Sequence, residues 1–151
     1  MAEGVLRHEA GDRFEVFSAG TKPTHVRPEA IEVMAEIGID ISSHRSKSVD
    51  EFVGQGLDYV ITVCSNANET CPVFPGTTRR LHWPFDDPAA LEGSEAVRMA
   101  AFRRVRDQIH SRIMVFLADV GQDGILRGGW LPPPQPKHAG GSEYELVKHS
   151  S

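Results

Sequence analysis

The two cysteines of this chain are the residues whose type and spacing most directly indicate chemistry. Cys64 and Cys71 are separated by a polar stretch in a Cys-x6-Cys arrangement. An uncharged run of β-branched and aromatic residues, Tyr59–Val63, comes directly before Cys64 and predicts a buried strand. In an open α/β sheet, ligands bind at the carboxyl ends of the strands. The sequence therefore predicts one thiol at the end of a strand and a second on the segment that follows.

The Cys-x6-Cys spacing restricts how the two thiols can react with each other. If the segment between them were helical, the Cα atoms would lie about 10 Å apart, whereas a disulfide needs a Cα separation of roughly 4.4–6.8 Å. Asn66, Asn68 and Thr70 make this segment a weak helix that bends readily, as a redox switch would require. Two unrelated cysteines are the commoner explanation of such a spacing. A zinc site that includes His82 is a third, although the pair lacks the spacing of zinc ligands.

Composition predicts one globular domain in the cytoplasm. The chain has 151 residues, of which 40% are hydrophobic and 25% charged. The net charge of −5 argues against general binding to nucleic acid. No apolar run is long enough to span a membrane, and Met1–Glu9 lacks the apolar core of a signal peptide. In a reducing cytoplasm, a disulfide would be transient and catalytic rather than structural.

Helices alternating with short strands would position the two thiols. Helices are expected over Met1–Ala10, from Pro28 to Gly38, from Ser48 and from Ser94 to about Leu117, and strands at Phe14–Ser18, Tyr59–Val63 and Arg79–Trp83. This alternation predicts an α/β domain with a parallel sheet over residues 1–120, although the three strands are fewer than such a sheet usually has. Beyond Val120, two Gly-Gly pairs and a Pro-Pro-Pro run predict that residues 121–151 form a disordered tail.

Short stretches in order along residues 1 to about 118 also match a known family. They are Met1–Gly4, Phe17–Thr21, Pro28–Ile31, Gly38–Ser42, Asp58–Cys64, Cys71–Pro72 and Trp83–Pro88. Together they make the chain resemble the thioredoxin-coupled arsenate reductases, which share the low-molecular-weight protein tyrosine phosphatase fold. The resemblance implies a three-layer α/β fold with a parallel sheet of the flavodoxin-like type. It also favours a functional role for the two cysteines over an unrelated pair.

The resemblance implies a role for each candidate site residue. In such enzymes a first cysteine attacks arsenate, a second attacks the thiol–arsenate adduct and releases arsenite, and a third attacks the second. Cys64 resembles the second cysteine and Cys71 the third, so the cascade would end in a Cys64–Cys71 disulfide. Thioredoxin would then reduce it as an external reductant, with no resident cofactor. Asp87 resembles the general acid that protonates the departing oxygen, although it could be an ordinary turn aspartate, and Asp86 is the runner-up.

The resemblance also bears on a metal ion. Some relatives bind potassium near the positions of Glu3 and Ser18. In this sequence Lys47 stands close to where a carboxylate ligand is expected. Its ammonium would replace the ion, so no metal is expected, while an exposed lysine without such a role is the alternative.

The chain departs from the family at its first strand. The family's Cys-x5-Arg loop precedes the Met-Ala-Glu-Gly motif, whereas this sequence starts with that motif and contains no Cys-x5-Arg. We therefore expect an N-terminally truncated domain that lacks the middle strand of its sheet, is inactive alone and is poorly stable as a monomer. Two alternatives remain: a low-molecular-weight protein tyrosine phosphatase relative, and a non-catalytic fragment that serves as a redox or interaction module.

Overall fold

The computed structural model describes residues 1–20, 25–63, 79–121 and 143–149. Its elements are α1 (Ala2–Ala10), β1 (Phe14–Gly20), α2 (Pro28–Ala35), the 3-10 helix η1 (Val49–Phe52), β2 (Tyr59–Thr62), β3 (Arg79–His82), the 3-10 helix η2 (Pro88–Ala90), α3 (Glu95–Gly121) and β4 (Glu143–His149). The helices and strands expected from the sequence are present, and β4 and η2 are additions.

Local signals explain where several elements begin and end. The side chain of Ser48 caps η1 by accepting a hydrogen bond from the Asp50 N–H. Ser94 does the same for α3 through the Val97 N–H, at 3.4 Å. The chain leaves α2 through Gly38, whose φ of +79° is a left-handed conformation that glycine adopts without strain. Each of these signals lies within a few residues of the start or end of its element, which is why the sequence predicts where the elements begin and end.

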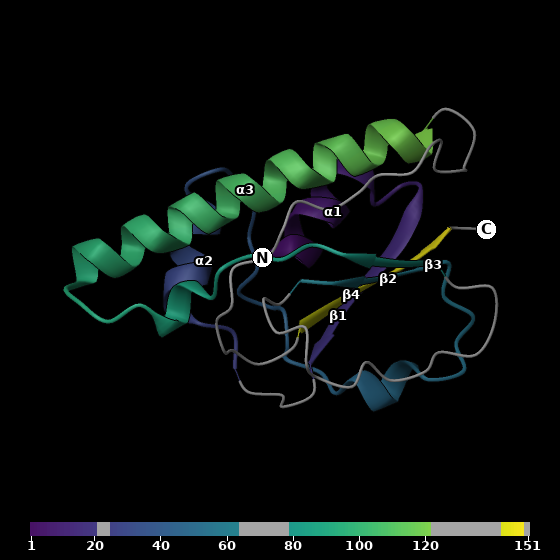
Figure 1. Ribbon diagram of the computed structural model, residues 1–151, viewed down its shortest axis with the longest axis horizontal. Helices are drawn as coiled ribbons and strands as arrows, with labels where there is room; N and C mark the ends of the chain where they lie inside the picture. Colours follow the sequence, from purple (N-terminus) through teal and green to yellow (C-terminus); the bar gives the residue numbers. More distant parts are fainter. Residues whose placement is uncertain (21–24, 64–78, 122–142, 150–151) are drawn as a thin grey trace.

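The four strands form one mixed sheet in the order β1-β4-β2-β3. β2 and β3 run parallel, with Thr62 opposite His82. β4 lies between β1 and β2 and runs antiparallel to both. The expected fold class, α/β, is confirmed, but the sheet is not purely parallel and its middle position is filled (Figure 1).

The C-terminal segment corrects the prediction of a disordered tail. Glu143–His149 is a strand that pairs with seven residues of β1 and four of β2, while residues 122–142 lie outside the described part of the chain. β1 and β2 leave backbone N–H and C=O groups facing each other, and an extended segment can satisfy them whatever its side-chain pattern. Leu146 and Val147, each 0% exposed, add apolar burial on the two faces. We expected the sheet to lack a strand in the middle, but β1 and β2 both pair with β4 there.

Two apolar clusters lie on opposite faces of the sheet. The three α-helices cover one face, where the larger cluster packs around Tyr59, Trp83 and Phe116 (Figure 1). The centroid of the Phe116 ring lies 5.3 Å from that of Tyr59 and 5.5 Å from that of Trp83, and both ring pairs are edge to face. η1 lies on the other face, where the smaller cluster contains Ala19, Val49, Phe52, Leu57, Val60 and Leu146. The helix-covered face thus holds the larger part of the apolar core.

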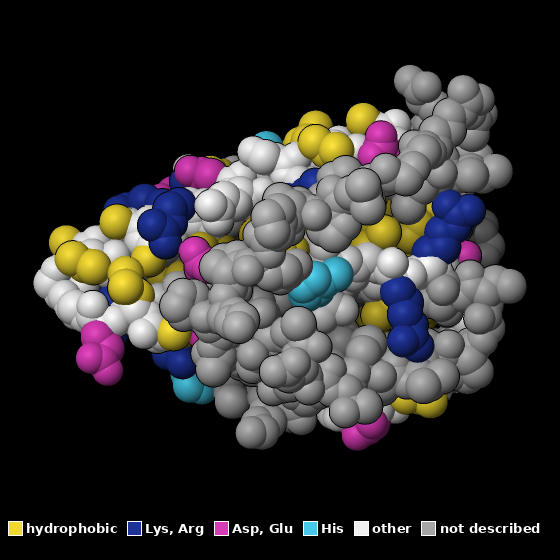
Figure 2. Space-filling view, in the orientation of Figure 1, with side chains coloured by type: hydrophobic (Ala, Val, Ile, Leu, Met, Phe, Trp, Pro, Cys, Tyr) yellow, Lys and Arg dark blue, Asp and Glu magenta, His cyan; other side chains and the backbone are white. Residues whose placement is uncertain are grey.

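Four arginines of α3 are paired with acidic neighbours. Arg98 lies 3.4 Å from Glu29, Arg104 lies 4.0 Å from Asp86, and Glu36 is shared by two arginines, Arg103 at 2.6 Å and Arg106 at 2.9 Å. Figure 2 shows basic and acidic side chains interspersed over this helix. The helix surface therefore presents mixed charge. Within the described residues, no helix is long and apolar enough to cross a membrane.

Candidate functional site

The carboxyl ends of β1, β2 and β3 meet at one edge of the sheet. β1 and β2 point the same way because each is antiparallel to β4, and β3 is parallel to β2. The first residues of α1 lie over the same edge, because Glu3 contacts Ser18 near the end of β1. The segment before η1 joins them through a bridge between Gly20 and Ser48. This edge is where an open α/β sheet places its ligands.

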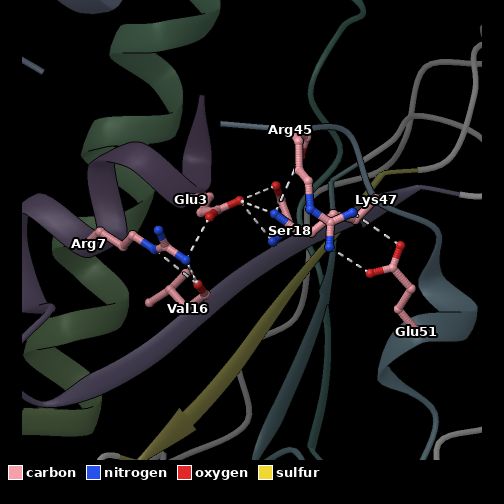
Figure 3. Close-up of polar contacts among 7 residues, drawn as sticks. All are labelled: Glu3, Arg7, Val16, Ser18, Arg45, Lys47 and Glu51. Carbon is pink, nitrogen blue, oxygen red and sulfur yellow. Dashed lines mark hydrogen bonds and ion pairs between the residues drawn. The ribbon is translucent and has the colours of Figure 1, made fainter. Parts of the chain in front are cut away.

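A buried carboxylate ties α1 to β1 at this edge (Figure 3). Glu3 is 2% exposed and accepts hydrogen bonds from the Ser18 N–H, at 3.0 Å, and from the Ser18 hydroxyl. Arg7, one turn along α1, lies 2.9 Å from the other carboxylate oxygen and also donates to the carbonyl of Val16. Lys47 completes the group with its Nζ 3.4 Å from Glu3. We call Glu3, Arg7, Ser18 and Lys47 the Glu3 cluster.

The Glu3 cluster keeps its carboxylate ionised. Burial raises the pKa of Glu3, but the Ser18 hydrogen bond and the charges of Lys47 and Arg7 outweigh it, and the net shift is downward. The pKa of His44 is lowered by burial, and the attraction of Glu3 only partly opposes this. One negative charge thus lies among several positive ones at the amino end of α1.

Lys47 is held inside the cluster rather than extended into solvent. Its side chain is 10% exposed, and its Nζ also donates to the carbonyl of Arg45 at 3.4 Å. The alternative of an exposed lysine is therefore wrong. Among the described residues, no group of three or more His, Cys, Asp or Glu side chains could hold a metal ion.

Asp87 lies on the loop that leaves β3. It is exposed, caps η2 and accepts a hydrogen bond from the Ala89 N–H at 2.9 Å. This is the contact expected of an ordinary turn aspartate, and it holds one carboxylate oxygen in place. Its neighbour Asp86 is also exposed and lies 4.0 Å from Arg104. The structure thus places Asp87 on the connection that follows the carboxyl end of β3.

Cys64 and Cys71 lie outside the described residues. The described chain reaches Val63, just past the end of β2. There Thr62 is paired with His82 at the end of β3, whose Nε2 is buried and has no hydrogen-bond partner in the described part of the chain. The strand predicted to lead into Cys64 therefore ends at the edge where Glu3 and Ser18 lie.

Glu145 is a buried charged residue that sequence reasoning missed. It is 3% exposed and lies opposite Ser18 on β1 and Ile61 on β2. The sequence signal that could have indicated a strand here is short: Tyr144, Leu146 and Val147 in a segment otherwise lacking periodicity. Glu145 therefore adds a second carboxylate beside the Glu3 cluster.

Comparisons with known proteins agree on one family. The family described as low molecular weight phosphotyrosine protein phosphatase matches residues 1–125. An "Arsenate reductase" from Halalkalibacterium halodurans is 45% identical over 122 residues, which are 81% of this chain and 87% of that protein. An "Arsenate reductase" from Bacillus subtilis is 41% identical over the same shares. A solved structure, "An arsenate reductase in reduced state", superposes with a TM-score of 0.65 at 29% identity and covers 79% of this chain and 86% of its own.

Proposed function

This chain belongs to the low molecular weight phosphotyrosine protein phosphatase family and, within it, to the arsenate reductases, and from that premise we propose that Cys64 and Cys71 carry the later steps of arsenate reduction. The observation that supports this is the placement of the carboxyl end of β2, which leads directly into Cys64, beside the amino end of α1 and the Glu3 cluster. Parallel strands and a helix amino end converge there, as an oxyanion site requires.

The proposed reaction balances as a transfer of two electrons to arsenic. A first thiolate attacks arsenate, and Asp87 protonates the oxygen that leaves as water. Cys64 attacks the sulfur of the adduct, the S–As bond breaks, and its electron pair stays on arsenic, which departs as arsenite. Cys71 attacks Cys64, frees the first thiolate and leaves a Cys64–Cys71 disulfide. A dithiol, which we propose is thioredoxin in the cytoplasm, reduces that disulfide.

The 151-residue chain by itself is proposed to be inactive. It contains no Cys-x5-Arg, so neither the first nucleophile nor an arginine for the transition state is supplied. The Met1 side chain makes no cap hydrogen bond to α1. Backbone N–H groups at a helix amino end attract an oxyanion, but none of the described residues at this end is a cysteine that could attack it.

A coupled assay tests the proposal. With thioredoxin, thioredoxin reductase and NADPH, the unextended chain should show no arsenate-dependent NADPH consumption. A version extended upstream by a strand and a Cys-x5-Arg-Ser loop should gain it, and Cys64→Ser or Cys71→Ser in that version should abolish it. Glu15→Gln, on an exposed position of β1, is the matched control and should keep the turnover. Arsenate-dependent turnover by the unextended chain would contradict the proposal.

The disulfide can be tested in the unextended chain. Mild oxidation should join Cys64 and Cys71 reversibly within one molecule, because the polar segment between them can bend. Peptide mapping without reductant identifies the bond. Free thiols, or only intermolecular dimers, would show that the pair does not act as a switch.

The same extended chain separates the proposal from its alternatives. Hydrolysis of an aryl phosphate without arsenate reduction would favour a phosphatase, whose chemistry needs only the first cysteine. Loss of both activities with the Cys64–Cys71 disulfide intact would favour a redox or interaction module.

A further inference from the structure

β1 is the outermost strand on one side of the described sheet. The strand order β1-β4-β2-β3 leaves one edge of β1 facing β4 and the other facing away from the sheet. In an antiparallel pair, the backbone groups of alternate residues point to the partner, and those of the residues between them point away. The Val16 carbonyl and the Ser18 N–H point away, because both bond to side chains of α1. Such an outward-facing edge is a template for another strand unless something covers it.

The Glu3–Arg7 ion pair occupies the place of one residue of a neighbouring strand (Figure 3). A residue on a parallel neighbour would donate its N–H to the Val16 carbonyl and accept a hydrogen bond from the Ser18 N–H. Arg7 supplies the donors, with its Nε 3.1 Å and its Nη2 2.8 Å from the Val16 oxygen. Glu3 supplies the acceptor, 3.0 Å from the Ser18 nitrogen. The two side chains lie 2.9 Å apart on one face of α1, so together they replace a peptide group.

The cover over this edge has a buried part and a surface part. At the end of β1 the backbone itself closes the edge, because Gly20 bridges to Ser48 and donates its N–H to the Lys47 carbonyl at 2.9 Å. Before that point the closing groups are side chains. The Glu3 side chain is 3% exposed and that of Arg7 is 47% exposed. The guanidinium is therefore the part that separates the edge from solvent.

The sequence of β1 suits pairing with a second copy of itself. Its seven residues include one charged side chain and no proline, a composition typical of segments that pair with identical segments. In an antiparallel register centred on Val16, Val16 lies opposite Val16 and Phe14 opposite Ser18, which by alternation are the residues with outward backbone groups. Glu15 then lies opposite Phe17, so like charges do not face each other. This register also leaves the backbone bridge at the end of β1 intact.

We propose that the outer edge of β1 is a self-complementary docking edge held closed by the Glu3–Arg7 ion pair, and that a second copy of this chain pairs with it when the ion pair is removed. Charge-assisted hydrogen bonds are stronger than those between neutral groups, so the intact pair keeps the edge closed. Each copy has one such edge, and the two would meet about a two-fold axis, which gives a closed dimer. The inference needs only α1 and β1, so it stands or falls independently of the proposed function.

Sedimentation equilibrium tests the docking edge with matched arginine substitutions. Arg7→Ala should dimerise with a dissociation constant lower than that of the wild type by about tenfold or more. Arg98→Ala is the control, because Arg98 is 44% exposed and also pairs with a glutamate of another turn or helix, Glu29, and it should behave as the wild type. Equal association of the two variants, or none in Arg7→Ala, would overturn the inference. The double variant Glu3→Gln with Arg7→Ala should dimerise as well, and it decides the test if Arg7→Ala alone does not fold, because no buried carboxylate is left without its partner.

Spin labels locate the contact in the dimer. The label is attached to Glu15→Cys, at an exposed position of β1, in a chain that carries Arg7→Ala, Cys64→Ser and Cys71→Ser. In the register centred on Val16 the two labelled residues have Cα atoms about 8 Å apart, so the spectrum should show strong dipolar broadening that disappears on dilution with unlabelled chain. A dimer without broadening would place the contact elsewhere and overturn the inference.

Amide hydrogen exchange of the wild-type chain tests the closure without any substitution. The Ser18 N–H faces outward, so its protection depends on Glu3, whereas by alternation the Phe17 N–H bonds to β4. We expect the Ser18 amide to exchange within about tenfold of the Phe17 amide. A Ser18 amide that exchanges as fast as one on an open strand edge would show that the ion pair does not close β1, and would overturn the inference.

Discussion

At the scale of single residues, Glu3 joins parts of the chain that are far apart in sequence. It connects the first turn of α1 with β1 through Ser18 and with the segment before η1 through Lys47. A buried carboxylate is stable only when charges and hydrogen-bond donors replace the water it has lost. The two donors of Ser18, together with the charges of Lys47 and Arg7, supply that replacement. Glu3 therefore positions the amino end of α1 at the proposed site.

Glu3→Gln tests this positioning role. The amide keeps the shape of the side chain but loses the charge that pairs with Arg7 and Lys47, so we expect a loss of about 1–3 kcal/mol in the free energy of unfolding. Urea denaturation measures it. The matched control is Glu15→Gln, on an exposed position of β1, which should change stability by less than about 0.5 kcal/mol. Equal effects of the two substitutions would contradict the role.

The lowered pKa of Glu3 makes stability depend on pH. Burial raises this pKa, but the Ser18 hydrogen bond and the charges of Lys47 and Arg7 together lower it by more. The folded-state pKa of Glu3 therefore lies below the unfolded one. The resulting stabilisation is fully present above the unfolded pKa, about 4.3, and is lost as the pH falls through the folded value. Between about pH 5 and pH 3, the wild type should therefore lose stability more steeply than Glu3→Gln. Parallel curves in urea denaturation would contradict this.

At the scale of elements, β4 shows that a strand can form without a periodic sequence. Its pairing satisfies backbone groups on both β1 and β2, and its apolar contribution comes chiefly from two adjacent residues that point to opposite faces, Leu146 and Val147. The α-helices differ, because their buried stripes and caps are local. A strand in the middle of a sheet depends mainly on having two neighbours.

Leu146→Ala tests whether β4 is part of the folded core. Leu146 is 0% exposed and packs in the smaller cluster with Phe52 and Val60. Removing its side chain should cost about 2–5 kcal/mol, as for other buried leucines. Val115→Ala, on a side chain of α3 that is 53% exposed, should change stability by less than about 0.5 kcal/mol. A Leu146→Ala protein as stable as the wild type would show that the C-terminal segment is not part of the folded core.

At the scale of the whole molecule, the described residues cover the two faces of the sheet unequally. Three α-helices bury the larger cluster, while η1 packs over the smaller one in the described structure (Figure 1). η1 is a single short 3-10 turn that buries two apolar side chains, Val49 and Phe52. Regions with few buried contacts open at lower free energy than the rest of a protein. The face covered by η1 should therefore be the less stable one.

Hydrogen exchange at low urea concentrations tests this asymmetry. Amides in the buried part of α3, from Ile109 to Phe116, should exchange through global unfolding, with a free energy that falls steeply with urea. Amides of η1 and the turn after it, such as Gln55, should exchange through local opening, with little dependence on urea. Identical free energies and urea slopes for both groups would show that the two faces unfold together.

The sequence alone determined the local elements and the family. Caps and apolar stripes act within a few residues, so α1, α2, α3, β1 and β2 could be predicted, and short motifs in order indicated an arsenate reductase. Motifs in the sequence anticipated three parts of the candidate site: the strand leading to Cys64, the turn at Asp87 and the proximity of Glu3 to Lys47. The placements of Cys64 and Cys71 themselves stay predictions.

Only the tertiary structure decided what fills the middle of the sheet. β4 pairs with residues more than a hundred positions away in β1, and no local pattern records such a partner, because backbone hydrogen bonds are available to any extended segment that reaches them. The burial of Glu145 follows from that pairing, and that of Lys47 from the chain returning to α1 after α2. Such contacts depend on where distant segments meet in space, and side-chain periodicity does not encode this.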